Sequence, residues 1–219
     1  MKTGIRIHTL ALGALLALLS GCSLLGAKPP AALTHYALDD ASAAVAPAPS
    51  ARQPAAASPV IIVNPTAAAS GFDSARMVYL RAPQRLEAFA NNAWVDTPAR
   101  MLAPLLVQAL QSDGSYRAVL LAPSAGKADL RLDTSIVRLQ QDFRQSPSTV
   151  RFTLQATLMD NTTREVIAWR ELDAVRVAGA DDPAAGALAA RLAVQDVLQQ
   201  LALMCQAAAV GWTPKSVAN

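Results

Sequence analysis

The chain has 219 residues, of which 53% are hydrophobic and 16% are charged, and its formal net charge at pH 7 is +3. Two of the positive charges, Lys2 and Arg6, stand at the N-terminus, and the other basic residues are scattered along the chain among the acids. Because proteins that follow a phosphate backbone need clustered Lys and Arg, we expect no nucleic-acid partner. The length suits one domain plus a tether.

The N-terminus has the composition of a secretory signal peptide. Lys2 and Arg6 precede a continuous stretch of small and apolar residues from Leu10 to Leu19, which is the usual order of a charged segment followed by an apolar one. At about 1.5 Å per residue, this stretch spans roughly half of a ~30 Å hydrocarbon core, so it is too short for a stable transmembrane helix. Residues 1–21 are therefore predicted to be a signal peptide.

The predicted signal peptide ends in Leu19-Ser20-Gly21-Cys22, which resembles the bacterial lipobox. That resemblance implies cleavage between Gly21 and Cys22 and attachment of a diacylglycerol to the Cys22 sulfur. Ser23 follows, where an Asp would favour retention in the inner membrane. The resemblance therefore implies an anchor in the inner leaflet of the outer membrane, facing the periplasm. The alternative is an ordinary signal peptide with an incidental cysteine.

Two segments rich in small residues and proline flank a short strand pattern. Residues 22–32 are predicted to be the lipidated tether, and residues 41–57 hold mostly Ala, Pro and Ser without an aromatic side chain. Such a composition buries too little apolar surface to offset the entropy of ordering, so we interpret 41–57 as a flexible loop. Residues 33–38 (LTHYAL) are interpreted as the first strand. The alternative is that the folded domain begins only at Ser58.

The middle of the chain changes from strand patterns to a helix pattern. In chain order the sequence predicts a buried strand at 59–63, a loop at 64–74, an alternating strand at 75–82 and its hairpin partner at 84–92. Thr97 and Pro98 are typical of the N-cap and first position of a helix, which is expected to stop at Gly114. Its apolar face is formed by Met101, Leu102, Leu105, Leu106, Ala109 and Leu110.

The second half holds the clearest strand patterns, expected at 116–122, 128–143, 148–160 and 164–177. The last two are joined through residues 161–163, which predicts a hairpin. Asp182 and Pro183 indicate the start of a final helix that ends near Gly211 and precedes a tail at 212–219. Its buried stripe is expected to contain Val194, Val197, Leu201, Met204 and Ala208. The elements predict an α/β domain of the α+β kind over residues 33–211, with a mixed, largely antiparallel sheet covered by two amphipathic helices.

The sequence offers little for catalysis or metal binding. Ser-His-Asp and Cys-His sites need an imidazole, and the mature chain keeps only His35, which we interpret as a solvated residue at a strand end. His35 and Cys205 alone do not supply the clustered ligands of a zinc site, so no metal and no cofactor is expected, and Cys205 is interpreted as a buried apolar residue. Carboxylate-only catalysis stays open on composition, because Glu87, Glu165 and Glu171 are available.

Residues 63–110 resemble the core signature of the ABC-type transport auxiliary lipoproteins, the PqiC-like family. The shared features are Met77-Val78-Tyr79 in a strand, a second strand, Trp94-Val95-Asp96 and a Leu-rich helix; residues 128–143 and 150–174 also resemble that family's paired strands. The resemblance covers roughly 33–211. It implies a fold similar to the anticodon-binding and TolB N-terminal type. It also implies a non-enzymatic role in the outer membrane, beside an MCE-type system that moves lipids between the two membranes.

Three classes of function follow. The leading hypothesis is an interaction subunit of an envelope lipid transporter that binds an MCE-family periplasmic protein and forms a homo-oligomer, such as a ring. The second is an assembly or scaffolding lipoprotein for another envelope machine, and the third is a periplasmic hydrolase.

Trp94 and Trp212 are the candidate interaction residues, because aromatic side chains are favoured at the centres of interfaces. Trp212 is the better candidate, since it follows the final helix in a polar tail. The alternative places Trp94 in the core, where it packs beside the N-cap of the first helix, and makes Trp169 a core strand residue.

Overall fold

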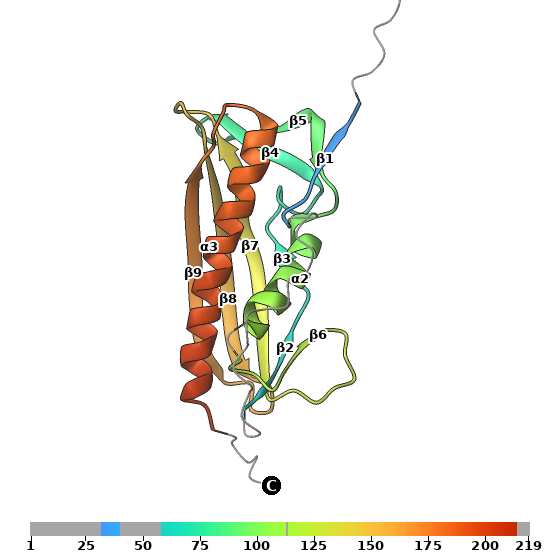
Figure 1. The fold of residues 1–219 in the computed structure, drawn as a ribbon, viewed down its shortest axis with the longest axis vertical. Helices are drawn as coiled ribbons and strands as arrows, with labels where there is room; N and C mark the ends of the chain where they lie inside the picture. The colour runs from blue at the N-terminus through green and yellow to red at the C-terminus, as the bar shows by residue number, and fades with distance from the viewer. Residues whose placement is uncertain (1–31, 40–57, 113, 214–219) are drawn as a thin grey trace, which may run out of the picture. The chain divides into compact units, whose positions relative to one another are not determined.

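Three long strands form the tall part of the sheet in the computed structural model, which describes residues 32–39, 58–112 and 114–213. They are β7 (Leu130–Asp142), β8 (Thr149–Asp160) and β9 (Val166–Val177), paired antiparallel in the order β7-β8-β9 (Figure 1). Along β8 every second residue from Val150 to Leu158 is buried, as the alternation predicts. The predicted hairpin between β8 and β9 is confirmed.

Six shorter strands extend the sheet from the other side of β7. They are β1 (Thr34–Tyr36), β2 (Val60–Val63), β3 (Ala67–Ala68), β4 (Arg76–Ala82), β5 (Arg85–Trp94) and β6 (Ala118–Leu121). β2, β3 and β4 all pair parallel with β7, at successive heights along it. β6 pairs parallel with β2, β5 pairs antiparallel with β4, and β1 pairs parallel with β5. The sheet is therefore mixed, and its longest ladders are the antiparallel ones, as predicted.

Residues 33–38 settle the beginning of the sheet. Thr34 to Tyr36 pair in register with Asn92 to Trp94, and Leu38 is buried in the main core. This confirms the first strand expected from the sequence and excludes a fold that begins only at Ser58. The segment 64–74, predicted as a loop, contains the two-residue strand β3. It was missed because two alanines carry no alternating pattern.

Two helices cover one face of the sheet (Figure 1). In α2 (Pro98–Gln111) the Thr97 hydroxyl accepts a hydrogen bond from the Arg100 N–H, and in α3 (Pro183–Val210) an Asp182 carboxylate oxygen accepts one from the Ala185 N–H at 2.8 Å. Both caps and both proline positions were predicted. α2 ends at Gln111, a little before Gly114.

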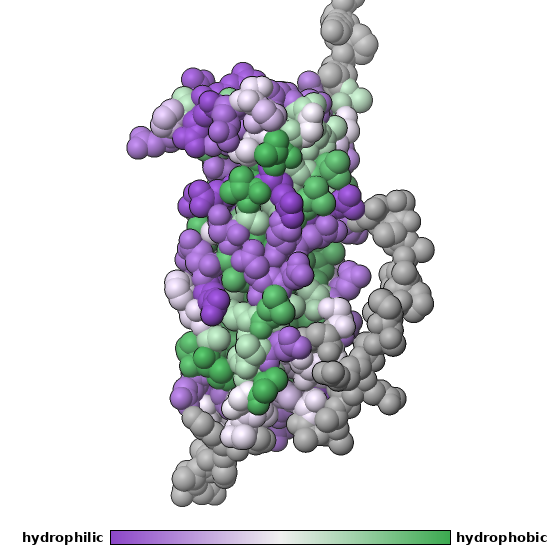
Figure 2. Space-filling model, turned by 60° about the vertical axis from the view of Figure 1, so that its left-hand side comes forward, coloured by the Kyte–Doolittle hydropathy of each residue, from purple (hydrophilic) through white to green (hydrophobic). Residues whose placement is uncertain are grey.

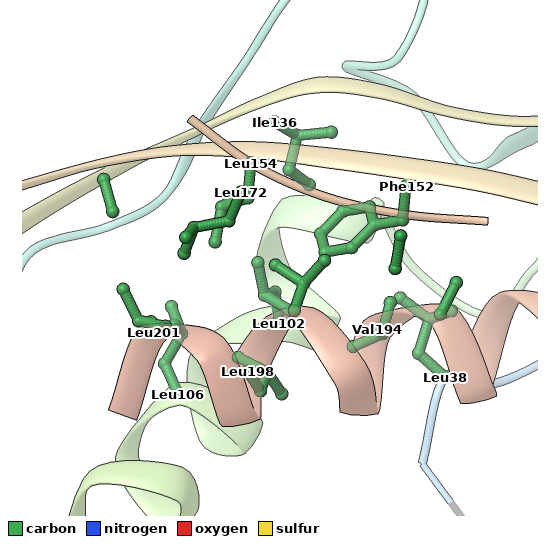
Figure 3. Packing of buried hydrophobic residues seen from close by; sticks show 14 of the residues in the cluster. Leu38, Leu102, Leu106, Ile136, Phe152, Leu154, Leu172, Val194, Leu198 and Leu201 are labelled. Atoms are coloured by element: carbon green, nitrogen blue, oxygen red, sulfur yellow. The ribbon is translucent and has the colours of Figure 1, made fainter. Parts of the chain in front are cut away.

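The core lies between the helices and that face of the sheet (Figure 3). Phe152 and Leu154 of β8 meet Val194 and Leu201 of α3, while Leu102 of α2 closes the space between the helices. Each such side chain contributes about 1.5–3 kcal/mol when it leaves water. Cys205 is also fully buried, as predicted. Among the described residues, no helix packs against the opposite face of β8 and β9.

Several predictions concern residues outside the described ranges. They include the signal peptide at 1–21, the cleavage between Gly21 and Cys22, the lipidation of Cys22, most of the tether at 22–32, the loop at 41–57 and the end of the tail at 214–219. In the part of the chain that is described, neither helix is apolar enough over sufficient length to cross a membrane.

Candidate interaction surfaces

Trp94 is a core residue, so its proposed place on an interaction surface is wrong. Its side chain is only 4% exposed and belongs to the main hydrophobic cluster. Trp94 is the last residue of β5, three positions before the Thr97 N-cap, and its N–H donates to the Ala75 carbonyl at 2.8 Å. At this point the chain leaves the sheet to enter α2, and the indole fills the space that the turn would otherwise leave open. The alternative, in which Trp94 packs in the core beside the N-cap of α2, is therefore correct.

Trp212 is half-buried rather than fully exposed. Its ring packs against the main core beyond the end of α3, and its indole N–H donates to a carboxylate oxygen of Asp160 at 2.9 Å. The residue therefore ties the C-terminal end of the domain to the turn after β8. This corrects the expectation that the end of the chain leaves Trp212 uncovered.

Asp160 is the centre of this contact. Its other carboxylate oxygen accepts hydrogen bonds from the backbone N–H groups of Thr162 and Thr163, at 2.8 and 2.9 Å. The hydrogen bond from Thr163 lowers the pKa of Asp160 below its ordinary value, helped by Trp212 and Thr162, although burial acts in the opposite direction. An ionised Asp160 thus holds the β8–β9 turn and Trp212 together.

We expect Asp160→Asn to lower the free energy of unfolding by about 1–3 kcal/mol at pH 7, because an amide has a single acceptor oxygen for the three donors that Asp160 binds. The folded-state pKa of Asp160 lies below that of an unfolded Asp. Its stabilisation is therefore present above about pH 4 and is lost as the pH falls through the folded-state pKa. Urea unfolding at pH 7 and pH 3 measures both effects. The difference between wild type and variant should shrink at pH 3, with the exposed Asp73→Asn as control; an equal difference at both pH values contradicts the assignment.

The exposed tryptophan is Trp169, which the sequence alternative had placed in the core. Its side chain is 59% exposed on the face of β9 away from the helices, opposite Thr157 of β8. The sequence contains a pattern that indicates this exposure. Trp169, Glu171 and Asp173 alternate along β9 and share one face of the strand, whereas the buried residues Leu172 and Ala174 lie on the other face. Large exposed apolar side chains on the same strand are Val166, Val175 and Val177.

Polar contacts fix the middle of this face. The Arg151 guanidinium of β8 donates to the Asp173 carboxylate at 2.9 Å, and the Thr153 hydroxyl donates to the same carboxylate. Burial acts to raise the pKa of Asp173, but the hydrogen bonds from Arg151 and Thr153 outweigh it and keep the pKa below its ordinary value. Beside them, the Gln155 amide donates to Glu171 at 3.2 Å.

The outer face of α3 is a second surface with exposed apolar side chains. They are Leu188, Leu192, Leu203 and Val210. Gln195 and Gln199 lie between them on the same side of the helix and are also exposed. Figure 2, which brings β9 and α3 forward, shows apolar residues interrupted by polar ones rather than one continuous patch. A helix that carries apolar residues on its outer face as well as its inner one is typical of a helix that is covered in an assembly.

A surface cavity of about 390 Å³ lies where the loop before β4 meets the β4–β5 hairpin. Its polar lining includes Asp73, Arg76 and Glu87, and its apolar lining includes Val78 and Leu86. These groups can hydrogen-bond a polar molecule. His35 is exposed in β1, as expected. The described residues also hold no cluster of three or more metal-ligating side chains.

Comparison with known proteins identifies similar chains. A family model described as ABC-type transport auxiliary lipoprotein component matches residues 36–202. Protein XCC0632 from Xanthomonas campestris has a similar structure, with a TM-score of 0.61 at 25% identity over 71% of this chain and 91% of that one. An uncharacterized protein matches with a TM-score of 0.59 at 14% identity over 78% and 97% of the two chains. No curated protein matches the chain.

Proposed function

The chain belongs to the family of ABC-type transport auxiliary lipoprotein components, and from this premise we propose that it is a non-enzymatic subunit of an intermembrane lipid transport system. In this proposal Cys22 is lipidated after cleavage at Gly21 and anchors the protein in the inner leaflet of the outer membrane. The folded domain then faces the periplasm and binds an MCE-family periplasmic protein. No cofactor takes part.

The observation that carries the proposal is the surface of the domain. Trp169 stands exposed among valines on one face of the sheet, and the outer face of α3 carries exposed leucines. Tryptophan is enriched where proteins bind one another, and exposed valines and leucines leave water when a partner covers them. By contrast, Asp160, Asp173 and Asp182 are used in a turn, an ion pair and a helix cap that stabilise the fold. These features support a role in binding other proteins.

The same surfaces support the proposal that several copies associate, in the form of a ring. Two separate surfaces with exposed apolar residues allow one to contact a neighbouring copy while the other contacts the transporter. A ring requires a head-to-tail arrangement in which two different surfaces of each copy meet. The outer face of α3 is our candidate for one side of that contact.

Sedimentation of a soluble form that lacks residues 1–22 tests the association. We expect a concentration-dependent oligomer, because the exposed leucines on α3 leave water when copies associate. Leu188→Glu combined with Leu203→Glu should return the protein to monomer without unfolding it, since both side chains already face solvent. The matched control is Gln111→Glu combined with Gln145→Glu, which adds the same charge at exposed positions outside α3 and should leave the association unchanged.

The second arm of the experiment adds an MCE-family periplasmic protein from the same organism. We expect the two proteins to sediment together. A strict monomer at high concentration that also fails to bind the MCE-family protein contradicts the proposal, and favours an assembly or scaffolding role in another envelope machine. Turnover of a lipid or glycan substrate by the purified protein would instead favour a hydrolase.

A further inference from the structure

β9 is a long edge of the sheet. Its 12 residues pair with β8 on one side, and no described strand pairs with it on the other (Figure 1). The opposite ends of the sheet are β1 and β6, which contain only 3 and 4 residues. An unpaired edge presents a row of backbone N–H and C=O groups that can pair with a further strand, and proteins generally shorten or cover such edges.

Two hydrogen bonds show which backbone groups point outward. Ala178 donates its N–H to the Ser148 carbonyl, toward β8, whereas the Asp173 carbonyl accepts a 3.4 Å hydrogen bond from the Gln200 side chain of α3, on the side away from β8. In an antiparallel strand, the N–H and C=O of one residue point toward the same neighbouring strand, and those of the next residue point to the opposite side. The backbone groups of Glu171 and Val175 therefore point away from β8, as those of Asp173 do. The Gln200 side chain thus hydrogen-bonds one carbonyl among the outward-pointing backbone groups of β9.

The side chains along the edge are those of an interface. Trp169, Val175 and Val177 follow the same alternation as the outward backbone groups and are more than half exposed. They lie on either side of the acidic residues Glu171 and Asp173. A long edge with exposed aromatic and branched side chains both offers backbone hydrogen bonds and buries apolar area when a strand is added to it.

A second copy of this chain is a poor occupant for the edge. Opposite residues of an antiparallel pair lie on the same face of the sheet, so symmetric pairing of β9 with itself is centred on a residue. A pairing that spans at least nine of the 12 residues of β9 must be centred on residue 170, 171, 172 or 173. These four registers bring together, in turn, Arg170 with Arg170, Glu171 with Glu171, Glu171 with Asp173, and Asp173 with Asp173. Like charges placed directly opposite destabilise a strand pair. The other two edges of the chain are too short to match 12 residues.

We propose that β9 accepts an extended strand from a different polypeptide, with a basic side chain opposite Glu171 and apolar side chains opposite Trp169 and Val175. Asp173 already has Arg151 as its cation, so Glu171 is the acid that the incoming strand neutralises. The added strand pairs with the outward backbone groups of β9 and covers Trp169. This inference rests on the proposed auxiliary function, which requires a protein partner, and it names the contact surface and the form of the partner's segment.

The direct test uses the full lipidated chain in detergent micelles and a fluorescently labelled synthetic peptide of about nine residues, the length of an ordinary strand. Its antiparallel register places lysine opposite Glu171 and valine opposite Trp169 and Val175. The control peptide has the same side chains but carries N-methyl groups on the amides that would donate to β9. We expect the first peptide to bind at least tenfold more tightly, and to protect the Glu171 and Asp173 amides from hydrogen exchange.

Two variants locate the contact. Glu171→Pro removes an outward N–H without removing a hydrogen bond to β8, so it should weaken peptide binding at least tenfold. Glu171→Thr keeps the N–H and should retain binding of a peptide whose lysine is replaced by threonine. The N-methylated peptide tests the same donor row on the unaltered protein, so the test does not depend on the folding of the proline variant.

Equal binding of the two peptides, or no binding of either, overturns the inference about β9. Co-sedimentation with an MCE-family protein would in that case still support the proposed function. Self-association that Glu171→Pro abolishes also overturns it, because a second copy is then the occupant of β9. Self-association that survives Glu171→Pro, together with selective peptide binding, supports it.

Discussion

Cys22→Ser should release the protein from the membrane. Each methylene of an acyl chain that enters the bilayer contributes about 0.8 kcal/mol, so the several chains of a mature lipoprotein make dissociation negligible, and serine has no thiol to accept the diacylglycerol. We therefore expect the wild type in the membrane fraction and Cys22→Ser in the soluble fraction, or as an uncleaved precursor. Separation of outer and inner membranes on a density gradient, with mass spectrometry of the N-terminal peptide, measures both the location and the lipid.

The matched control is Cys205→Ala, which removes the other of the two cysteines. Cys205 lies in the core of the domain, so its replacement leaves the lipidation signal unchanged and the protein should stay with the membrane. A Cys22→Ser variant that still fractionates with the outer membrane and carries lipid would show that the N-terminus is not a lipobox.

Gly186→Ala should cause a large loss of stability, about 2–3 kcal/mol, which corresponds to a fall in Tm of roughly 4–12 °C. A Cβ at this position of α3 would lie only 2.6 Å from Cδ of Gln141 in β7. Gln141 is 4% exposed, and its amide donates to the Ser148 hydroxyl at 2.9 Å and to the Asp182 carbonyl at 3.3 Å. The added methyl group therefore displaces a buried side chain and breaks its hydrogen bonds, which outweighs the roughly 1 kcal/mol that alanine gains over glycine within a helix.

The surroundings leave no room for the displaced amide. The cavity beside Gln141 and Gly186 has a volume of about 10 Å³, room for at most one water molecule. Adding Gln141→Ala to Gly186→Ala should recover part of the lost stability, because the clash is removed. Gly211→Ala is the control, since a Cβ there meets no atom within 4 Å. Equal melting temperatures for Gly186→Ala and Gly211→Ala would contradict this packing.

The elements that the sequence predicted well are those with long alternation or clear caps. Thr97 and Asp182 each precede a proline, and both helices begin where these residues place them. In β8 an uninterrupted alternation from Val150 to Leu158 identified the buried face. Both signals are local, so they need no knowledge of which strand pairs with which.

Other features depend on bulges and on neighbours distant in the sequence. In β7 a register shift between Ile136 and Arg138 moves the buried positions to Leu139 and Gln141, and in β4 a similar shift accompanies the burial of Met77 beside Val78. The parallel pairings of β2, β3 and β4 with β7 join segments about 60 residues apart or more, which short patterns do not specify.

The three tryptophans show the same difference between features that local sequence signals predict and features that depend on distant residues. Trp94 sits beside an N-cap, a local signal that favoured the core, and it is buried. Trp212 required knowledge of Asp160, 52 residues away, before its half-buried position could be inferred. The alternative that placed Trp169 in the core is wrong, because its alternation with Glu171 and Asp173 indicates the solvent face. The position of β9 at the edge of the described sheet leaves the Trp169 side chain uncovered.

Affinity isolation of the lipidated protein from native membranes tests the central claim most directly. Membranes should be solubilised in mild detergent, and the co-isolated proteins quantified by mass spectrometry against the same membranes without the tagged chain. We predict enrichment of an MCE-family periplasmic protein together with the permease of its ABC transporter. Enrichment of the components of another envelope machine, with no MCE-family protein above background, would contradict the account.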